Sequence, residues 1–335
     1  MELSWKVRKL ILKEPFRISY GQFDYRNALL VELSEQQIVG YGECVEITYY
    51  GIVLSDFEKE LTQIKKLLKE VSLVTPQEFY LLLEKWVQNS FLRSALDCAY
   101  WDLYGKRIGK SFGELNMLGE SLPISSLTLS GGTVQEQVQK IKSSAWNFFK
   151  IKFVGWNPTH VDALLQTGKK IAIDANTSLS PEHCEQLESS SSAAKLVYVE
   201  QPLKVGEYKV LSRNSIVNWM GDEDFQRIDQ LVELWPHYPS LNLKLMKCGG
   251  LTPALQVIKR AREYGLKVMI GCMTESSVGI SAGIALAPLC DYADLDGAEL
   301  ICNDDAIGSM VSCGELKLAK SPGLGIKMKS SNLER

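Results

Sequence analysis

Three acidic side chains stand at the ends of three successive apolar segments: Asp174 in IAIDAN, Glu200 in LVYVEQPL and Asp222 in WMGDEDF. In a barrel of repeating strand–helix units, the carboxyl ends of the strands form one rim, so these side chains would converge there. Any one of them could instead cap a helix or lie on the surface. Matched positions on three consecutive strands favour a divalent-metal site, and we expect one Mg²⁺ per subunit.

Two lysines precede this predicted metal site. Lys150 and Lys152 are two residues apart in FFKIKF, so both side chains point to the same face of a strand. Their apolar neighbours argue against a solvated face. Like charges and partial burial both lower a lysine pKa, which would move one of these amines toward the role of a general base.

A further lysine lies on the opposite side of the predicted barrel. In LNLKLMKCGG, strand periodicity places Asn242, Lys244 and Met246 on one face, while Lys247 belongs to the other face or to the GG turn. Lys244 is therefore the better interior candidate. A lysine on the second strand and another on the sixth can remove a proton from one face of a carbon and return one to the other.

The bulk composition excludes several classes of protein. The net charge of −3 provides no basic field for nucleic acid or an anionic membrane, and no apolar run approaches transmembrane length. The N-terminal MELSWKVRKLILKE lacks the apolar core of a signal peptide. Eight cysteines without a C-x-x-C pair indicate reduced thiols rather than a disulfide framework. We expect a cytoplasmic protein without nucleic-acid or membrane partners.

The chain divides into two regions of different pattern. Residues 1–120 begin with three strand-like segments and continue with helical ones, as expected for an α+β cap. Residues 121–299 alternate strand and helix, which is the pattern of a TIM-type barrel. No helix follows the last strand, and we expect 300–335 to return to the cap. The eight predicted strands are 123–130, 148–154, 169–175, 195–201, 216–222, 241–247, 265–271 and 292–297.

Motifs distributed along nearly the whole chain resemble a known family. They are YGEC at 41–44, SALDCAYWDLYGK at 94–106, KIK at 150–152, IDAN at 173–176, EQP at 200–202, GDED at 221–224, KLMKCGG at 244–250, GCMTES at 271–276, DLD at 294–296 and PGLG at 322–325. The chain resembles the muconate-lactonizing-enzyme subgroup of the enolase superfamily, and within it the dipeptide epimerases, of which the L-Ala-D/L-Glu epimerases are best known.

The resemblance implies both a fold and a mechanism. The fold is an α/β structure, a (β/α)₇β modified TIM barrel under an α+β capping domain built from both termini. Asp174, Glu200 and Asp222 look like the Mg²⁺ ligands. Lys152 and Lys244 look like the acid/base pair, with Lys150 supporting Lys152 electrostatically. The implied reaction inverts the α-carbon of the C-terminal residue of a dipeptide by 1,1-proton transfer through a metal-stabilised enediolate.

Acidic residues on the last predicted strand indicate the substrate class. Asp294 and Asp296 should share a strand face, and two carboxylates beyond the metal ligands suit the N-terminal ammonium of a dipeptide. In the resembled group this D-x-D is the dipeptide signature. Glu275, at the end of the seventh strand, could orient a lysine or bind substrate, and Thr128 and Met273 are further expected substrate contacts.

Other activities of the same superfamily stay open. An o-succinylbenzoate synthase needs one base and no ammonium pocket, muconate cycloisomerisation has no use for the D-x-D, and an N-acylamino acid racemase would present an apolar pocket there. A non-catalytic relative is a further alternative. The expected substrate is L-Ala-L/D-Glu or a related L-Ala-Xaa dipeptide, selected by cap loops at 21–26 and 46–53. Asp224 stands where relatives usually have serine. A homo-oligomer is neither indicated nor excluded.

Overall fold

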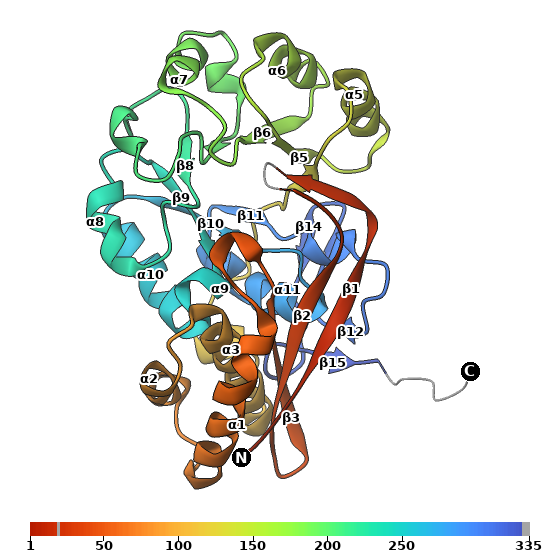
Figure 1. Ribbon diagram of the computed structural model, residues 1–335, viewed down its shortest axis with the longest axis vertical. Helices are drawn as coiled ribbons and strands as arrows, with labels where there is room; N and C mark the ends of the chain where they lie inside the picture. Colours follow the sequence, from red (N-terminus) through yellow and green to blue (C-terminus); the bar gives the residue numbers. More distant parts are fainter. Residues whose placement is uncertain (19–20, 330–335) are drawn as a thin grey trace.

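The N-terminal region is an antiparallel sheet packed on helices. The computed structural model describes residues 1–18 and 21–329, and the chain starts with β1 (Glu2–Ile18), β2 (Gly21–Glu35) and β3 (Ile38–Val45), paired in the order β1-β2-β3 (Figure 1). The buried face of β2, including Leu29, Val31 and Leu33, packs in one core with the following helices. The segment 21–26, expected to be a loop, is instead the beginning of β2, because it pairs with the end of β1.

Three helices form the rest of this core: α1 (Glu58–Leu67), α2 (Pro76–Trp86) and α3 (Ser90–Ile108). The Thr75 hydroxyl accepts from the backbone N–H of Glu78 and so caps the start of α2. Helix α3 ends at Gly109, whose left-handed φ of 74° suits glycine. The shorter helices of this region are η1 (Thr48–Tyr50), η2 (Leu54–Phe57), η3 (Leu68–Glu70) and α4 (Phe112–Leu115).

The second region is an eight-stranded parallel barrel. Its strands are β4 (Leu127–Leu129), β5 (Phe148–Lys152), β6 (Lys170–Asp174), β7 (Val199–Glu200), β8 (Trp219–Gly221), β9 (Ser240–Lys244), β10 (Lys267–Gly271) and β11 (Tyr292–Asp294). Each pairs with the next along the chain, and a bridge between Ser125 and Ala293 joins the last strand to the first. All eight predicted strands are therefore confirmed, although each is shorter than its predicted range.

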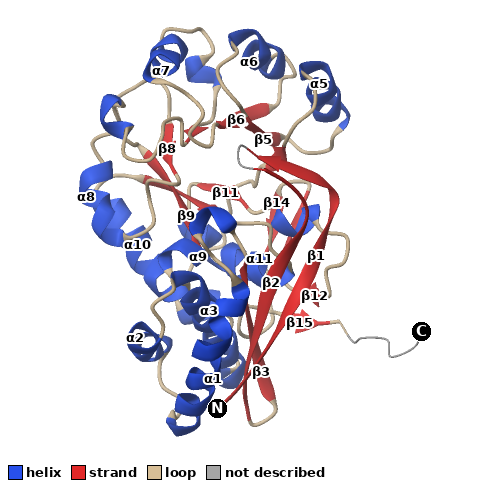
Figure 2. Ribbon diagram, viewed as in Figure 1, coloured by secondary structure: helices blue, strands red, loops and turns tan. Residues whose placement is uncertain are grey.

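Helices surround the barrel on the outside (Figure 2). They are α5 (Val134–Ser143), α6 (Pro158–Leu165), α7 (Pro181–Glu188), α8 (Leu231–Leu234), α9 (Leu245–Cys248), α10 (Leu251–Glu263) and α11 (Ser277–Leu286), with the 3₁₀ segments η4 (Ala193–Lys195), η6 (Ile228–Gln230) and η7 (Ala287–Leu289). The connection from β7 to β8 has only the 3₁₀ turn η5 (Tyr208–Val210), since Pro202 and Gly206 interrupt that segment. In the described part of the chain, no helix is both long and apolar enough to cross a membrane.

The segment after the barrel runs back to the N-terminal region. It contains η8 (Gly297–Leu300), the strand pair β12 (Ala306–Ile307) and β15 (Lys327–Met328), and the hairpin β13 (Met310–Ser312)–β14 (Glu315–Lys317). A bridge joins Ile301 to Leu12 of β1, and the backbone N–H of Leu324 donates to Asp102 of α3 at 2.8 Å. The N-terminal sheet also reaches the barrel, where Glu14 pairs with Lys140 of α5 at 3.0 Å.

Candidate active site

Three acidic side chains leave neighbouring strands at the same rim of the barrel. Asp174 is the last residue of β6 and is paired in register with Glu200, the last residue of β7. Asp222 follows β8 directly. All three are buried. The parallel register of β6, β7 and β8 brings the ends of these strands to the same rim of the barrel, and this is why the three carboxylates converge as predicted.

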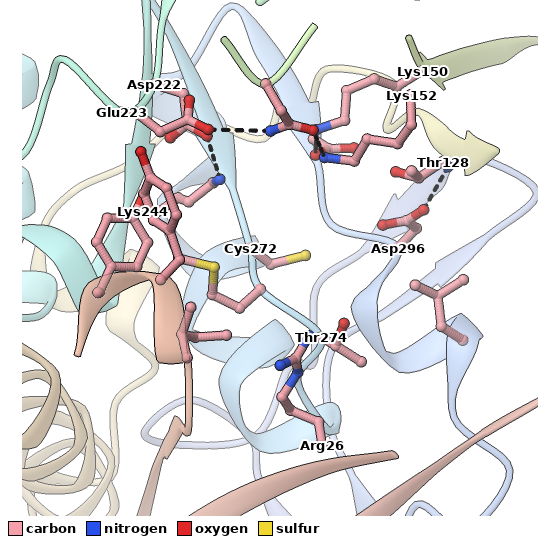
Figure 3. Close-up of a pocket in the computed structure, with 17 residues that line it drawn as sticks. Arg26, Thr128, Lys150, Lys152, Asp222, Glu223, Lys244, Cys272, Thr274 and Asp296 are labelled. Atoms are coloured by element: carbon pink, nitrogen blue, oxygen red, sulfur yellow. Dashed lines mark hydrogen bonds and ion pairs between the residues drawn. The ribbon is translucent and has the colours of Figure 1, made fainter. Parts of the chain in front are cut away.

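The predicted lysines meet these carboxylates directly, and Figure 3 shows Lys244 close to Asp222. The Lys152 ammonium donates to Asp174 Oδ2 at 2.6 Å, and the Lys244 ammonium donates to Asp222 Oδ2 at 2.6 Å. Lys150 donates to Glu200 Oε2 at 3.2 Å and also contacts Asp294. Lys152 and Lys244 come from β5 and β9, which are separated by three strands in either direction around the barrel. The two amines therefore approach the acids from opposite sides.

The lysine–carboxylate contacts set the electrostatics of the site. Burial and the negative charge of Asp174 raise the pKa of Glu200 to about 8. Burial alone would lower the pKa of Lys150, but the carboxylates of Asp294, Glu200 and Asp174 outweigh it and raise that pKa well above its ordinary value. Asp222 outweighs burial at Lys244 in the same way and raises its pKa. The expectation that like charge and burial lower a lysine pKa is therefore wrong for Lys150.

The donor set of the three acids fits a hard divalent cation. Asp174, Glu200 and Asp222 are buried oxygen donors, and burial together with the charges of Asp174 and Asp222 raises the pKa of Glu200, so bringing a cation among them relieves repulsion. Within residues 1–18 and 21–329, no three acidic, histidine or cysteine side chains lie close enough to ligate one ion as they stand. Each of the three carboxylates instead pairs with a lysine.

Lys247, assigned from the sequence to the opposite face or the GG turn, contacts one of these acids, Asp222. Strand β9 ends at Lys244, and the single turn α9 directs the Lys247 ammonium to the backbone oxygen of Asp222 at 2.6 Å and to its Oδ1. Met246, predicted to share the face of Lys244, instead packs in the core of the N-terminal region. The periodicity argument failed here because the strand stops two residues earlier than the apolar pattern suggests.

The two aspartates of the D-x-D lie beside the lysines. Asp294 ends β11 and its Oδ1 accepts from Ser126 Oγ at 2.6 Å. Asp296 lies after the end of β11, so the prediction that it shares a strand face with Asp294 is wrong. Its Oδ2 accepts from the backbone N–H of Thr128 at 2.6 Å. Burial and the charge of Asp294 raise the pKa of Asp296 to about 7.

Two residues that the sequence reasoning missed join the acids and the lysines. Asn176 Oδ1 accepts from the Lys152 ammonium at 3.0 Å, and Asn176 Nδ2 donates to Glu223 Oε1 at 3.2 Å (Figure 3). Both side chains line the cavity. Burial and the charge of Asp222 raise the pKa of Glu223 to about 7. The polar neighbours of Asp174 and Asp222 in IDAN and GDED were the available signal.

The N-terminal region supplies part of the wall of the cavity above the acids. Its walls include Arg26 of β2 and Tyr49 and Tyr50 of η1, so both expected selection segments supply side chains. The predicted contacts Thr128, Lys150, Lys152, Asp222, Lys244, Met273, Asp294 and Asp296 also line it. Asp174 and Glu200 lie beneath this lining.

Glu275 does not line this cavity, although substrate contact was one of its expected roles. Its Oε1 accepts from the backbone N–H of Met273 at 2.7 Å, and the carboxyl lies against Gly279 of α11. Burial raises the pKa of Glu275 to about 8. The side chain therefore holds the turn that presents Met273, rather than facing the acids.

Comparison with known proteins gives matches along both regions. Residues 4–119 match the family model described as mandelate racemase / muconate lactonizing enzyme, N-terminal domain, and residues 133–332 match the one described as enolase C-terminal domain-like. An L-Ala-D/L-amino acid epimerase from Flavobacterium johnsoniae is 32% identical over 98% of this chain and 100% of its own. One from a Maribacter species is 35% identical over 97% of this chain and 98% of its own.

Solved structures of dipeptide epimerases have a fold similar to that of this chain. The dipeptide epimerase from Enterococcus faecalis, complexed with Mg and the dipeptide L-Leu-L-Tyr, superposes with a TM-score of 0.85. It is 26% identical, and the match covers 97% of this chain and 99% of that one.

Proposed function

The chain belongs to the mandelate racemase / muconate lactonizing enzyme family of the enolase superfamily, and on that premise we propose that it is a Mg²⁺-dependent dipeptide epimerase. The observation that carries the proposal is the placement of Lys152 and Lys244 on opposite sides of three buried carboxylates. Inversion by a two-base mechanism needs one proton-transfer group on each face of the carbon whose configuration changes, and a lysine amine can fill each role.

Asp174, Glu200 and Asp222 would hold the metal ion. When bound, Mg²⁺ supplies Lewis-acid stabilisation of the negative charge that develops on the substrate carboxylate as the α-proton leaves. The neutral amine of one lysine takes the α-proton, and the ammonium of the other donates a proton to the opposite face. The configuration at that carbon inverts, and each lysine ends in the protonation state with which the other began.

Lys150 has a supporting role in this scheme. Its ammonium lies between Glu200 and Asp294 with 4% of its side chain exposed, so it neutralises acids that would otherwise repel one another. It also adds positive charge next to Lys152 on the same strand. Its ion pairs are all with carboxylates, and Lys152 is the more exposed of the two β5 amines, with 15% of its side chain accessible.

The substrate proposed for this site is L-Ala-L/D-Glu or a related L-Ala-Xaa dipeptide. Asp294 and Asp296 line the cavity and offer carboxylate oxygens to an N-terminal ammonium. Thr128 and Met273 line the same cavity and are proposed substrate contacts. The names of the Flavobacterium and Maribacter relatives support an L-Ala dipeptide with a variable second residue.

Proton NMR of a pooled library of L,L-dipeptides with the enzyme and Mg²⁺ in D₂O tests the proposal. The expected result is loss of the C-terminal α-proton signal and growth of a second diastereomer, with neither change in the presence of EDTA and no second diastereomer with the Lys244→Ala variant. Exchange only with N-acylamino acids would instead identify a racemase of that class. No exchange with either class would overturn the proposal.

A further inference from the structure

Gln201, which follows Glu200 at the end of β7, forms hydrogen bonds to the segments that follow β6 and β8. The side-chain oxygen of Gln201 accepts from the backbone N–H groups of Asp222 at 3.0 Å and Asp224 at 3.1 Å. Its backbone oxygen accepts from Thr177 at 2.8 Å, in the loop that follows Asp174. Gln201 adopts a φ of 35°, which is unusual for a residue with a side chain and persists only where surrounding contacts enforce it.

Asp224 fixes the orientation of the Gln201 amide. The amide nitrogen donates to Asp224 Oδ2 at 2.7 Å and to the backbone oxygen of Leu203 at 3.0 Å. Together with the two bonds that the amide oxygen accepts, these contacts use the full hydrogen-bonding capacity of the side chain. A rotation that exchanged the oxygen and the nitrogen would point N–H groups at two backbone N–H groups.

Asp224 is itself held only by donors. Besides the Gln201 amide, it accepts from the Tyr238 hydroxyl at 2.8 Å and from the backbone N–H of Gly206 at 2.8 Å. The side chain is buried and does not line the cavity. A carboxylate meets three donors at once, whereas an amide at this position would bring its own N–H groups against them.

We propose that Asp224, acting through Gln201, is a positioning residue that sets the place of the Asp222 carboxylate and thereby the affinity of the site for Mg²⁺. The inference rests on the proposed function, because it takes Asp222 as a metal ligand. Lys247 donates to the Oδ1 and to the backbone oxygen of Asp222, and the Gln201 side-chain oxygen accepts from the backbone N–H of Asp222. Residues that orient metal ligands typically change metal affinity about 10–100-fold when they are replaced.

Isothermal titration of the full-length, chelator-treated protein with MgCl₂ tests this inference. The Asp224→Asn variant keeps the shape of the side chain and should raise the Kd for Mg²⁺ about 10–100-fold. The Tyr238→Phe variant removes one donor and keeps the carboxylate, so its Kd should rise about two- to tenfold. Thermal unfolding of each variant in EDTA separates a loss of stability from a loss of metal affinity.

Asp102→Asn is the matched control. Asp102 is also a buried carboxylate, and it accepts from the backbone N–H groups of Tyr41 and Leu324 and from Lys106, all outside the site. This variant should lower the unfolding temperature in EDTA and leave the Kd for Mg²⁺ within twofold of the wild type.

The outcomes separate this inference from the proposed function. An unchanged Kd in folded Asp224→Asn protein overturns the inference, and if that variant does not fold, an unchanged Kd in Tyr238→Phe does so. Wild-type protein that binds Mg²⁺ but epimerises no dipeptide removes the proposed function and leaves the inference intact. Wild-type protein that binds no Mg²⁺ overturns both.

Discussion

Replacing Lys150 by methionine should destabilise the protein about twice as much as the same change two residues later. The Lys150 ammonium lies 3.2 Å from Glu200 and 3.6 Å from Asp174 and also contacts Asp294. Its side chain is 4% exposed, against 15% for Lys152. Methionine fills a similar volume and removes the charge, so three buried carboxylates lose their common partner.

The expected size of the effect follows from these contacts. Removing one partner of a buried ion pair costs about 3–5 kcal/mol. Unfolding 335 residues releases an entropy of about 0.7 kcal/mol/K, so Lys150→Met should lower the unfolding temperature by about 4–7 °C. Lys152 has one carboxylate partner, Asp174, and in the Lys152→Met variant this carboxylate still has Lys150 as a partner. Loss of a single charged hydrogen bond costs about 1.5–3 kcal/mol, so Lys152→Met should lower the temperature by about 2–4 °C.

Thermal unfolding followed by circular dichroism at pH 7.5 in EDTA measures both variants against the wild type. EDTA excludes any contribution from a bound cation, so the difference between the variants reports the lysine contacts alone. An equal decrease in both variants, or no decrease in Lys150→Met, would refute the argument that Lys150 is the shared counter-ion of the buried acids.

Three further predictions concern the pH dependence, the packing and the metal. Burial raises the pKa of Asp97 to about 7, so the folded protein binds that proton more tightly than the unfolded chain and its stability declines as the pH rises from about 4 through 7. Asp97→Asn should therefore show a smaller decrease in unfolding temperature between pH 5 and pH 8 than the wild type, and an unchanged slope would contradict this assignment. A methyl group at Gly42 would lie 1.9 Å from the backbone oxygen of Ala95 in α3, so Gly42→Ala should cost about 1–3 kcal/mol or more in a denaturant titration. Gly113→Ala, where nothing lies within 4 Å, is its neutral control, and equal effects of the two changes would show that the approach of β3 to α3 is not tight. Mg²⁺ at 100 times its Kd should stabilise the wild type by about 2.7 kcal/mol, or about 4 °C in unfolding temperature, and EDTA should reverse the shift; no shift would count against the metal site.

The barrel and its acids could be predicted from local patterns. Apolar segments of strand length recur along residues 121–299, and an acid at the end of each of three consecutive segments needs only the parallel topology to converge. The lysines at 150 and 152 follow from the period of a strand. These features depend on neighbours in sequence, so the sequence alone is enough to predict them.

The predictions that failed concern where a strand ends and which side chains meet through contacts between residues distant in sequence. The end of β9 at Lys244 could not be read from LNLKLMK, since the apolar alternation continues through Met246. The turn that follows brings Lys247 to Asp222, 25 residues away in sequence. Glu275 turns to the backbone of Met273 because of the loop conformation after β10, which no periodicity describes. The segment 21–26 extends a strand through pairing with β1, a long-range contact.

Deuterium exchange by the two single-lysine variants tests the central claim most directly. Lys152→Ala and Lys244→Ala would each be incubated with Mg²⁺ in D₂O and separately with the L,L and L,D forms of the best dipeptide from the library, with NMR detection of the C-terminal α-proton. If the two lysines act on opposite faces, each variant will exchange the α-proton of one diastereomer only, the two variants will select opposite diastereomers, and neither will interconvert them. Exchange of the same diastereomer by both variants, or epimerisation by either one, would contradict the two-lysine account.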